Sequence, residues 1–162
     1  MSIMFRKMKT EEFDTFYQWS VEHHAKELME ECHMSQRKAI KETKKEVAQM
    51  LPNGLNTEHN YLMTIEEKDN KEIIGFIWTI HEETAGHKQS FLCDFVILES
   101  KRRKGYATAA LHLAEKNAAE AGCQESVLFV ADRNYAARTL YEKCGYKFLK
   151  QEDYGKYMTK QL

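Results

Sequence analysis

Residues 95–107 read FVILESKRRKGYA, and no other passage of the chain is as informative. An apolar strand ends there, four adjacent cations follow, and helical periodicity begins at once after Gly105. The first turn of a helix leaves backbone N–H groups unpaired and carries about half a positive charge, so it can cradle phosphate oxygens. The passage therefore predicts an anion site at the start of a helix. A solvated basic surface is the plain structural alternative.

Two common phosphate-binding loops are excluded at this turn. It lacks the Gly-x-x-x-x-Gly-Lys-Ser/Thr pattern of a Walker loop, and it lacks the second and third glycines of the dinucleotide fingerprint. A nucleotide-binding protein that uses the basic turn for ATP is therefore an unfavoured interpretation.

Working outward from the passage, periodicity predicts a succession of strands and helices. The first expected helix begins at residue 10, with Thr10 as its cap. Three further helices are expected over residues 35–50, 106–121 and 134–144. The expected strands cover residues 3–7, 61–67, 72–81, 90–98, 126–130, 147–151 and 157–161. Residues 90–98 are nearly all apolar, with Asp94 as the one charge, which indicates a central strand buried on both faces.

Composition narrows the class of protein. The 162 residues suit one domain, and 24 Lys and Arg against 25 Asp and Glu argue against nucleic acid or an anionic membrane as a partner. The four cysteines have no Cys-x-x-Cys spacing, and no apolar run approaches the roughly 18 residues that span a bilayer. We expect a cytoplasmic protein. The pairs His23-His24 and Cys32-His33 lack a third obvious partner, so no metal is expected.

Two motifs resemble those of the GNAT superfamily of N-acetyltransferases. The family's acetyl-CoA signature, Arg/Gln-x-x-Gly-x-Gly/Ala between a strand and a helix, is matched by RRKGYA at residues 102–107. Residues 134–146, NYAARTLYEKCGY, are similar to its second cofactor motif, Asn-x-x-Ala-x-x-Leu-Tyr-x-x-x-Gly-Phe. The resemblance covers essentially the whole chain. It implies a single domain over residues 1–162 of class α/β (α+β), with a central mixed, mostly antiparallel sheet flanked by helices.

The resemblance implies how acetyl-CoA would bind. Main-chain groups of Ile97 and its neighbours would pair with the pantetheine arm, as a sheet edge pairs with an added strand. Main-chain N–H groups from Arg103 to Thr108 would hold the pyrophosphate, although Arg103 stands where a glycine is common. Asn134 would bind pantetheine. The implied cofactor residues are Val96, Ile97, Arg102, Arg103, Lys104, Gly105, Tyr106, Ala107, Thr108, Asn134 and Tyr141.

The resemblance also implies N-acetyl transfer to a primary amine by direct attack in a ternary complex, with no metal and no nucleophilic residue. Tyr141 would protonate the leaving thiolate, although its place on the apolar face of a helix also suits a core aromatic. The amine must lose a proton before it attacks. Asp94 is a candidate general base; Glu82, Glu83 and a chain of water molecules are the alternatives.

The acceptor cannot be identified from the sequence. Glu27, Glu30 and Glu31 would suit a cationic amine, and a solvated helix surface explains them equally well. A non-catalytic acyl-CoA sensor is the alternative function, and it would have no need of an acid at Tyr141. A homodimer that pairs exposed sheet edges is possible.

Overall fold

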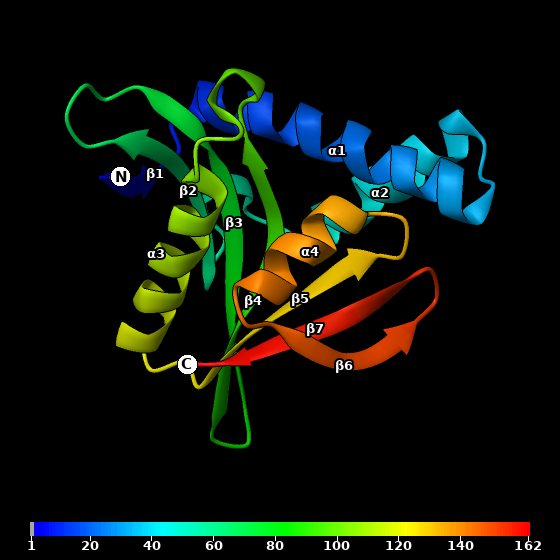
Figure 1. The fold of residues 1–162 in the computed structure, drawn as a ribbon. Helices are drawn as coiled ribbons and strands as arrows, with labels where there is room; N and C mark the ends of the chain where they lie inside the picture. The colour runs from blue at the N-terminus through cyan, green and yellow to red at the C-terminus, as the bar shows by residue number, and fades with distance from the viewer. Residues whose placement is uncertain (1) are drawn as a thin grey trace. The chain divides into compact units, whose positions relative to one another are not determined.

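Within residues 2–162, which the computed structural model describes, seven strands form one sheet in the order β1-β2-β3-β4-β5-β7-β6 (Figure 1). The strands are β1 Ile3–Lys7, β2 Asn60–Glu67, β3 Ile73–Thr84, β4 His87–Ile97, β5 Glu125–Ala131, β6 Lys147–Glu152 and β7 Gly155–Gln161. β4 and β5 run parallel, whereas β1–β2, β3–β4, β5–β7 and β6–β7 are antiparallel. The mixed, mostly antiparallel sheet expected from the sequence is confirmed.

The helices also lie close to their predicted bounds. They are α1 Thr10–Cys32, α2 Gln36–Met50, α3 Tyr106–Glu120 and α4 Tyr135–Lys143, with short 3-10 turns at Gly54–Asn56 and Glu99–Lys101. Contacts divide the chain into two compact units: residues 8–60, with α1 and α2, and residues 2–7 with 61–162, which hold the sheet, α3 and α4. In the part of the chain that the structure describes, no helix combines the length and the apolar character that crossing a bilayer requires.

Helix caps follow the sequence in one case and depart from it in another. Ser35 caps α2 as predicted, because its hydroxyl accepts the Lys38 N–H at 3.3 Å. The prediction that Thr10 caps α1 is wrong, since the cap is Lys9 and Thr10 is the first helical residue. The backbone N–H of Lys9 donates instead to the Glu12 carboxylate at 2.8 Å, so a side chain in the first turn satisfies the donor.

The apolar side chains of the sheet, α3 and α4 share one core. Its most deeply buried members are Ile65, Ile74, Ile77, Ala110, Leu111 and Leu128. Burying one large aliphatic side chain contributes about 1.5–3 kcal/mol, so this core fixes α3 firmly against the strands. The first turn of α3 thereby has a defined place relative to the end of β4.

The hairpin of β3 and β4 is longer than the sequence predicts. Residues 82–89 contain no large apolar side chain and were expected to lie outside the strands. The two strands nevertheless continue to a two-residue turn at Ala85 and Gly86, whose φ angles are 51° and 80°. The end of this hairpin is exposed, so its side chains need no apolar alternation. Periodicity therefore missed a paired region that no core requires.

Candidate active site

β4 and β5 separate partway along their length. Their parallel ladder joins residues 89–92 to residues 125–128 and ends there. β4 nevertheless continues to Ile97 and β5 to Ala131. The sheet therefore contains an opening between its two central strands, at the end of β4 that leads into α3.

A β-bulge lies where the strands separate. Leu92 lies opposite Thr79 and Asp94 opposite Trp78, so Cys93 is an extra residue on β4. Bulges re-aim the side chains that follow them and are common beside active sites. Beyond the bulge, Phe95 and Ile97 join the core shared with α3 and α4.

Asp94 therefore points to the opposite face of the sheet, because neighbouring side chains on a strand alternate. Its side chain is buried, with 6% exposed, and Val96 shares its face. Asp94 has partners within the folded chain. The predicted base thus stands on one side of β4, and the side chain of Ile97 stands on the other.

Main-chain groups of Ile97 face the opening. Leu98 N–H donates to the Ile74 oxygen of β3 at 2.9 Å. Adjacent residues of an antiparallel strand direct these groups to opposite edges, so Ile97 directs its own toward the β5 side. The Ile97 carbonyl accepts a hydrogen bond from Arg102 Nε at 3.0 Å. Arg102, predicted from the sequence to bind the cofactor, here holds the end of β4.

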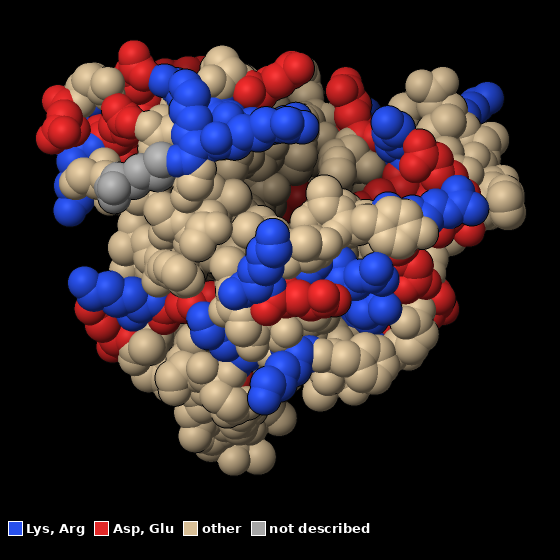
Figure 2. Space-filling view, in the orientation of Figure 1, with Lys and Arg blue, Asp and Glu red and all other residues tan. Residues whose placement is uncertain are grey.

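The loop that follows β4 has the backbone and charge features that the sequence predicted for an anion site. Gly105 precedes α3 with φ of 83°, and no described side chain caps the helix at this end. The backbone N–H groups of residues 106–108 therefore lack a capping side chain. Arg103 and Lys104 are exposed. Figure 2 shows Lys and Arg side chains gathered over this loop, beside a hollow that lies between the loop and α4.

Two side chains at the ends of this loop contact the β2–β3 hairpin. Lys101 forms an ion pair with Glu72, and the Tyr106 hydroxyl donates to a Glu67 carboxylate oxygen. The Tyr106 ring is buried in the core, with 7% exposed. The contact predicted between Tyr106 and the phosphates is made by its main-chain N–H, which this side-chain hydrogen bond does not involve, whereas the charge of Lys101 is paired with Glu72.

Arg103 adopts a conformation that its side chain disfavours. Its φ is 61°, in the left-handed region that favours glycine. We expect Arg103→Gly to raise the free energy of unfolding by about 0.5–1 kcal/mol, because relief of about 1–3 kcal/mol of strain exceeds the added entropy of a glycine. Urea denaturation measures the change. Lys104→Gly is the control, since Lys104 does not share the positive φ, and equal losses in both variants would contradict the strain.

The side chain of Asn134 caps α4 and also has a donor group that a ligand could use. Its Oδ1 accepts the Ala137 N–H at 3.3 Å. The amide nitrogen of Asn134 donates to no described residue, so it can donate to a ligand carbonyl. Capping and pantetheine binding are therefore compatible.

Tyr141 is half-buried on α4 and packs against the core. Its ring centroid lies 5.8 Å from that of Tyr146, whose hydroxyl forms a 2.8 Å hydrogen bond with Ser126. Burial raises the pKa of Tyr146 far above its usual range, so this hydroxyl stays protonated at neutral pH. Tyr141 is the more exposed of the two phenols, and thus the one that a ligand can reach.

Sequence reasoning missed three residues that shape the site. Gly75 lies opposite Ile97, and a Cβ there would stand 2.0 Å from the Val96 oxygen. A glycine within a strand is the signal of such a close approach. Glu67 and Glu72 flank the turn at 68–71. Nothing in the sequence of this polar turn indicates that the two carboxylates contact the loop between β4 and α3.

Known proteins resemble the chain in sequence and fold. A family model described as the acetyltransferase (GNAT) family matches residues 13–146. The chain is 32% identical over 147 residues to an uncharacterized N-acetyltransferase of Bacillus subtilis, YycN, covering 91% of this chain and 94% of that protein. The crystal structure of YycN has a TM-score of 0.87, with 30% identity over 93% of this chain and 96% of that one.

Two structures with bound ligands share the fold at lower identity. One is the PaiA N-acetyltransferase of Thermoplasma acidophilum in complex with coenzyme A, with a TM-score of 0.69, 20% identity and full coverage of both chains (100% each). The other is spermidine N-acetyltransferase of Vibrio cholerae in complex with CoA and spermine, with a TM-score of 0.67, 16% identity and coverage of 99% and 95%.

Proposed function

Since this chain belongs to the acetyltransferase (GNAT) family and is an acetyl-CoA-dependent acyltransferase, we propose that it acetylates a primary amine by direct attack in a ternary complex. One observation carries the proposal: an uncapped helix N-terminus adjoins the opening between β4 and β5. The helix end suits two phosphates, and the opening suits a chain of amides. Acetyl-CoA has both, and it supplies the activated thioester.

The start of α3 would bind the pyrophosphate. Backbone N–H groups of residues 106–108 point out of the first turn, and Gly105 adds no side chain that would block a phosphate. The exposed side chains of Arg103 and Lys104 supply the neighbouring positive charge. Lys101 contributes little to this charge because Glu72 neutralises it.

The separated strand would orient the pantetheine arm. Ile97 offers main-chain groups on the β5 side, and Asn134 offers a side-chain amide from α4. An arm held at both points runs through the opening and brings its thioester toward the bulge at Cys93. A main-chain N–H of β4 near Ile97 then donates to the carbonyl oxygen as negative charge develops on it.

Proton transfer completes the reaction. The attacking amine must be neutral, and Asp94 or a chain of water molecules takes its proton. Asp94 is the candidate that lies next to the bulge, and strand alternation places it on the face opposite Phe95 and Ile97. Tyr141, on α4, gives a proton to the departing thiolate. Acid and base would then act from opposite faces of β4.

Binding and transfer are tested together. Calorimetric titration with acetyl-CoA should show binding at one site, with ATP as a much weaker control ligand. Thiol release should then follow the addition of a suitable amine from a panel of peptides with free N-termini, lysine, polyamines and small amines. Absence of acetyl-CoA binding would overturn the proposal. Binding without release of thiol on any amine would favour a sensor.

Tyr141→Phe tests the assigned acid. We expect kcat to fall about 100-fold, because general acid catalysis contributes at least this much, and the loss of rate at alkaline pH to disappear. That loss reflects a phenol that must stay protonated to act. Tyr135→Phe is the matched control, since Tyr135 lies on the same helix with 63% exposed. Unchanged turnover and an unchanged alkaline limb in Tyr141→Phe would remove the acid role.

A further inference from the structure

The loop between β4 and α3 is held at both ends by one hairpin. Lys101, at its start, is paired with Glu72, and Tyr106, at its end, donates its hydroxyl to Glu67. Glu67 is the last residue of β2 and Glu72 precedes β3. The four residues between these anchors, 102–105, lead directly into the first turn of α3, whose N–H groups would bind the pyrophosphate.

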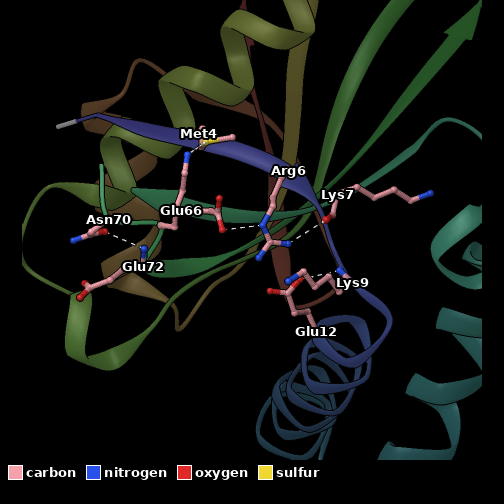
Figure 3. A network of polar contacts seen from close by, with 9 residues as sticks. Met4, Arg6, Lys7, Lys9, Glu12, Glu66, Asn70 and Glu72 are labelled. Carbon is pink, nitrogen blue, oxygen red and sulfur yellow. Dashed lines mark hydrogen bonds and ion pairs between the residues drawn. The ribbon is translucent and has the colours of Figure 1, made fainter. Parts of the chain in front are cut away.

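The hairpin that carries the two carboxylates is itself braced (Figure 3). Arg6 of β1 forms a 2.8 Å ion pair with Glu66, whose side chain is only 8% exposed. Within the turn, Glu72 N–H donates to Asn70 Oδ1 at 2.9 Å, and Lys71 Nζ lies 3.6 Å from Met4 Sδ. Contacts on each side of Glu67 and Glu72 therefore restrict the movement of both anchors.

Carboxylates this close to a phosphate site require a reason. An acidic side chain repels a phosphate, so Glu67 and Glu72 would weaken phosphate binding if they had no other role. Glu67 interacts with the loop: the hydrogen bond from Tyr106, with the charges of Lys101 and Lys104, lowers the pKa of the Glu67 carboxyl group. The structure shows it accepting from the first residue of α3, next to the backbone N–H groups that lack a capping side chain.

Strain in the loop indicates what the anchors do. Arg103 has φ of 61°, and such a conformation persists only where the surroundings fix it. The surroundings here are the two anchored ends. Without these two anchors, Arg103 would relax toward negative φ. The backbone N–H groups of the loop would then no longer converge on one anion.

We propose that Glu67, through Tyr106, is a positioning residue that holds the first turn of α3 in the conformation that binds the donor's diphosphate; Glu72 acts likewise through Lys101. The inference rests on the proposed function, because it takes the diphosphate to bind at this turn. The β2–β3 hairpin, which lies outside both cofactor motifs, would then take part in recognising the acetyl donor.

The test compares two ligands of the full chain, CoA and S-acetylpantetheine, which lacks the diphosphate and the nucleoside. Tyr106→Phe and Glu67→Ala each remove the same hydrogen bond. Each variant should raise the Kd for CoA about five- to tenfold, the size of one hydrogen bond to a charged group, and leave the Kd for S-acetylpantetheine within about twofold. NMR titration measures both constants.

The double variant and a control complete the design. Tyr106→Phe combined with Glu67→Ala should bind CoA no more weakly than either single variant, because one bond joins the two residues. Glu120→Ala removes an exposed carboxylate at the last residue of α3, the end opposite the proposed site, and should bind both ligands as the wild type does. Equal losses for both ligands, or no loss for CoA, would overturn the inference. Failure of the wild type to bind CoA would instead overturn the proposed function.

Discussion

Gly105→Glu is expected to weaken acetyl-CoA binding by at least about 100-fold, which corresponds to about 2.7 kcal/mol. Gly105 stands at the start of α3 with φ of 83°. A glutamate there adds bulk and a negative charge within a few ångströms of the phosphates, where like charges cost about 4 kcal/mol at an effective dielectric of 20. Calorimetric titration of the folded variant measures the loss.

The chain offers a close control for this substitution. Gly86 also has a positive φ, 80°, but it lies in the exposed turn of the β3–β4 hairpin, at the other end of β4. Gly86→Glu therefore carries the same charge and a similar backbone strain, and it should bind acetyl-CoA as the wild type does. A similar loss in both variants, or wild-type affinity in Gly105→Glu, would show that the diphosphate lies elsewhere.

Gly75→Ala is expected to lower the free energy of unfolding by about 3 kcal/mol or more, because the added atom cannot be accommodated. Its Cβ would stand 2.0 Å from the Val96 oxygen and 3.1 Å from Ile97 Cα, both backbone atoms that cannot rotate aside. β3 and β4 must separate at this point. The melting temperature should fall by roughly 6–12 °C for a chain of this size.

The same substitution should also affect the ligand. Val96 and Ile97 form the end of β4 that faces the opening, so displacing them should weaken acetyl-CoA binding. Gly86→Ala is the control, since a Cβ there meets nothing within 4 Å and only the strain of a positive φ, about 1 kcal/mol, is expected. Equal destabilisation by the two alanines would contradict the close approach of the strands.

Much of the fold could be predicted because local patterns and tertiary structure agree. Apolar residues recur along α3 at the spacing of a buried helix face, and Gly122, with φ of 90°, ends it where predicted. The cofactor motifs fall on the start of α3 and on α4. Ser35 shows the same agreement at the scale of one side chain.

Other features depend on contacts between residues far apart in the sequence. The bulge at Cys93 and the separation of β4 from β5 depend on how β3, β4 and β5 pair. The pattern of residues within β4 alone predicts neither feature. Glu67 and Tyr106 are 39 positions apart. A polar turn residue is usually solvated, so its contact with a distant loop has no local signal.

The separation of β4 and β5 also bears on how long the protein survives in a cell. A sheet whose central ladder stops partway is held less firmly there than where the ladder is complete, and such regions open first. A ligand that binds only the folded chain stabilises it by about 2.7 kcal/mol at roughly 100 times its Kd. A chain supplied with acetyl-CoA would then meet proteases in an open state less often than a starved one. The abundance of the enzyme would rise and fall with the supply of its acetyl donor.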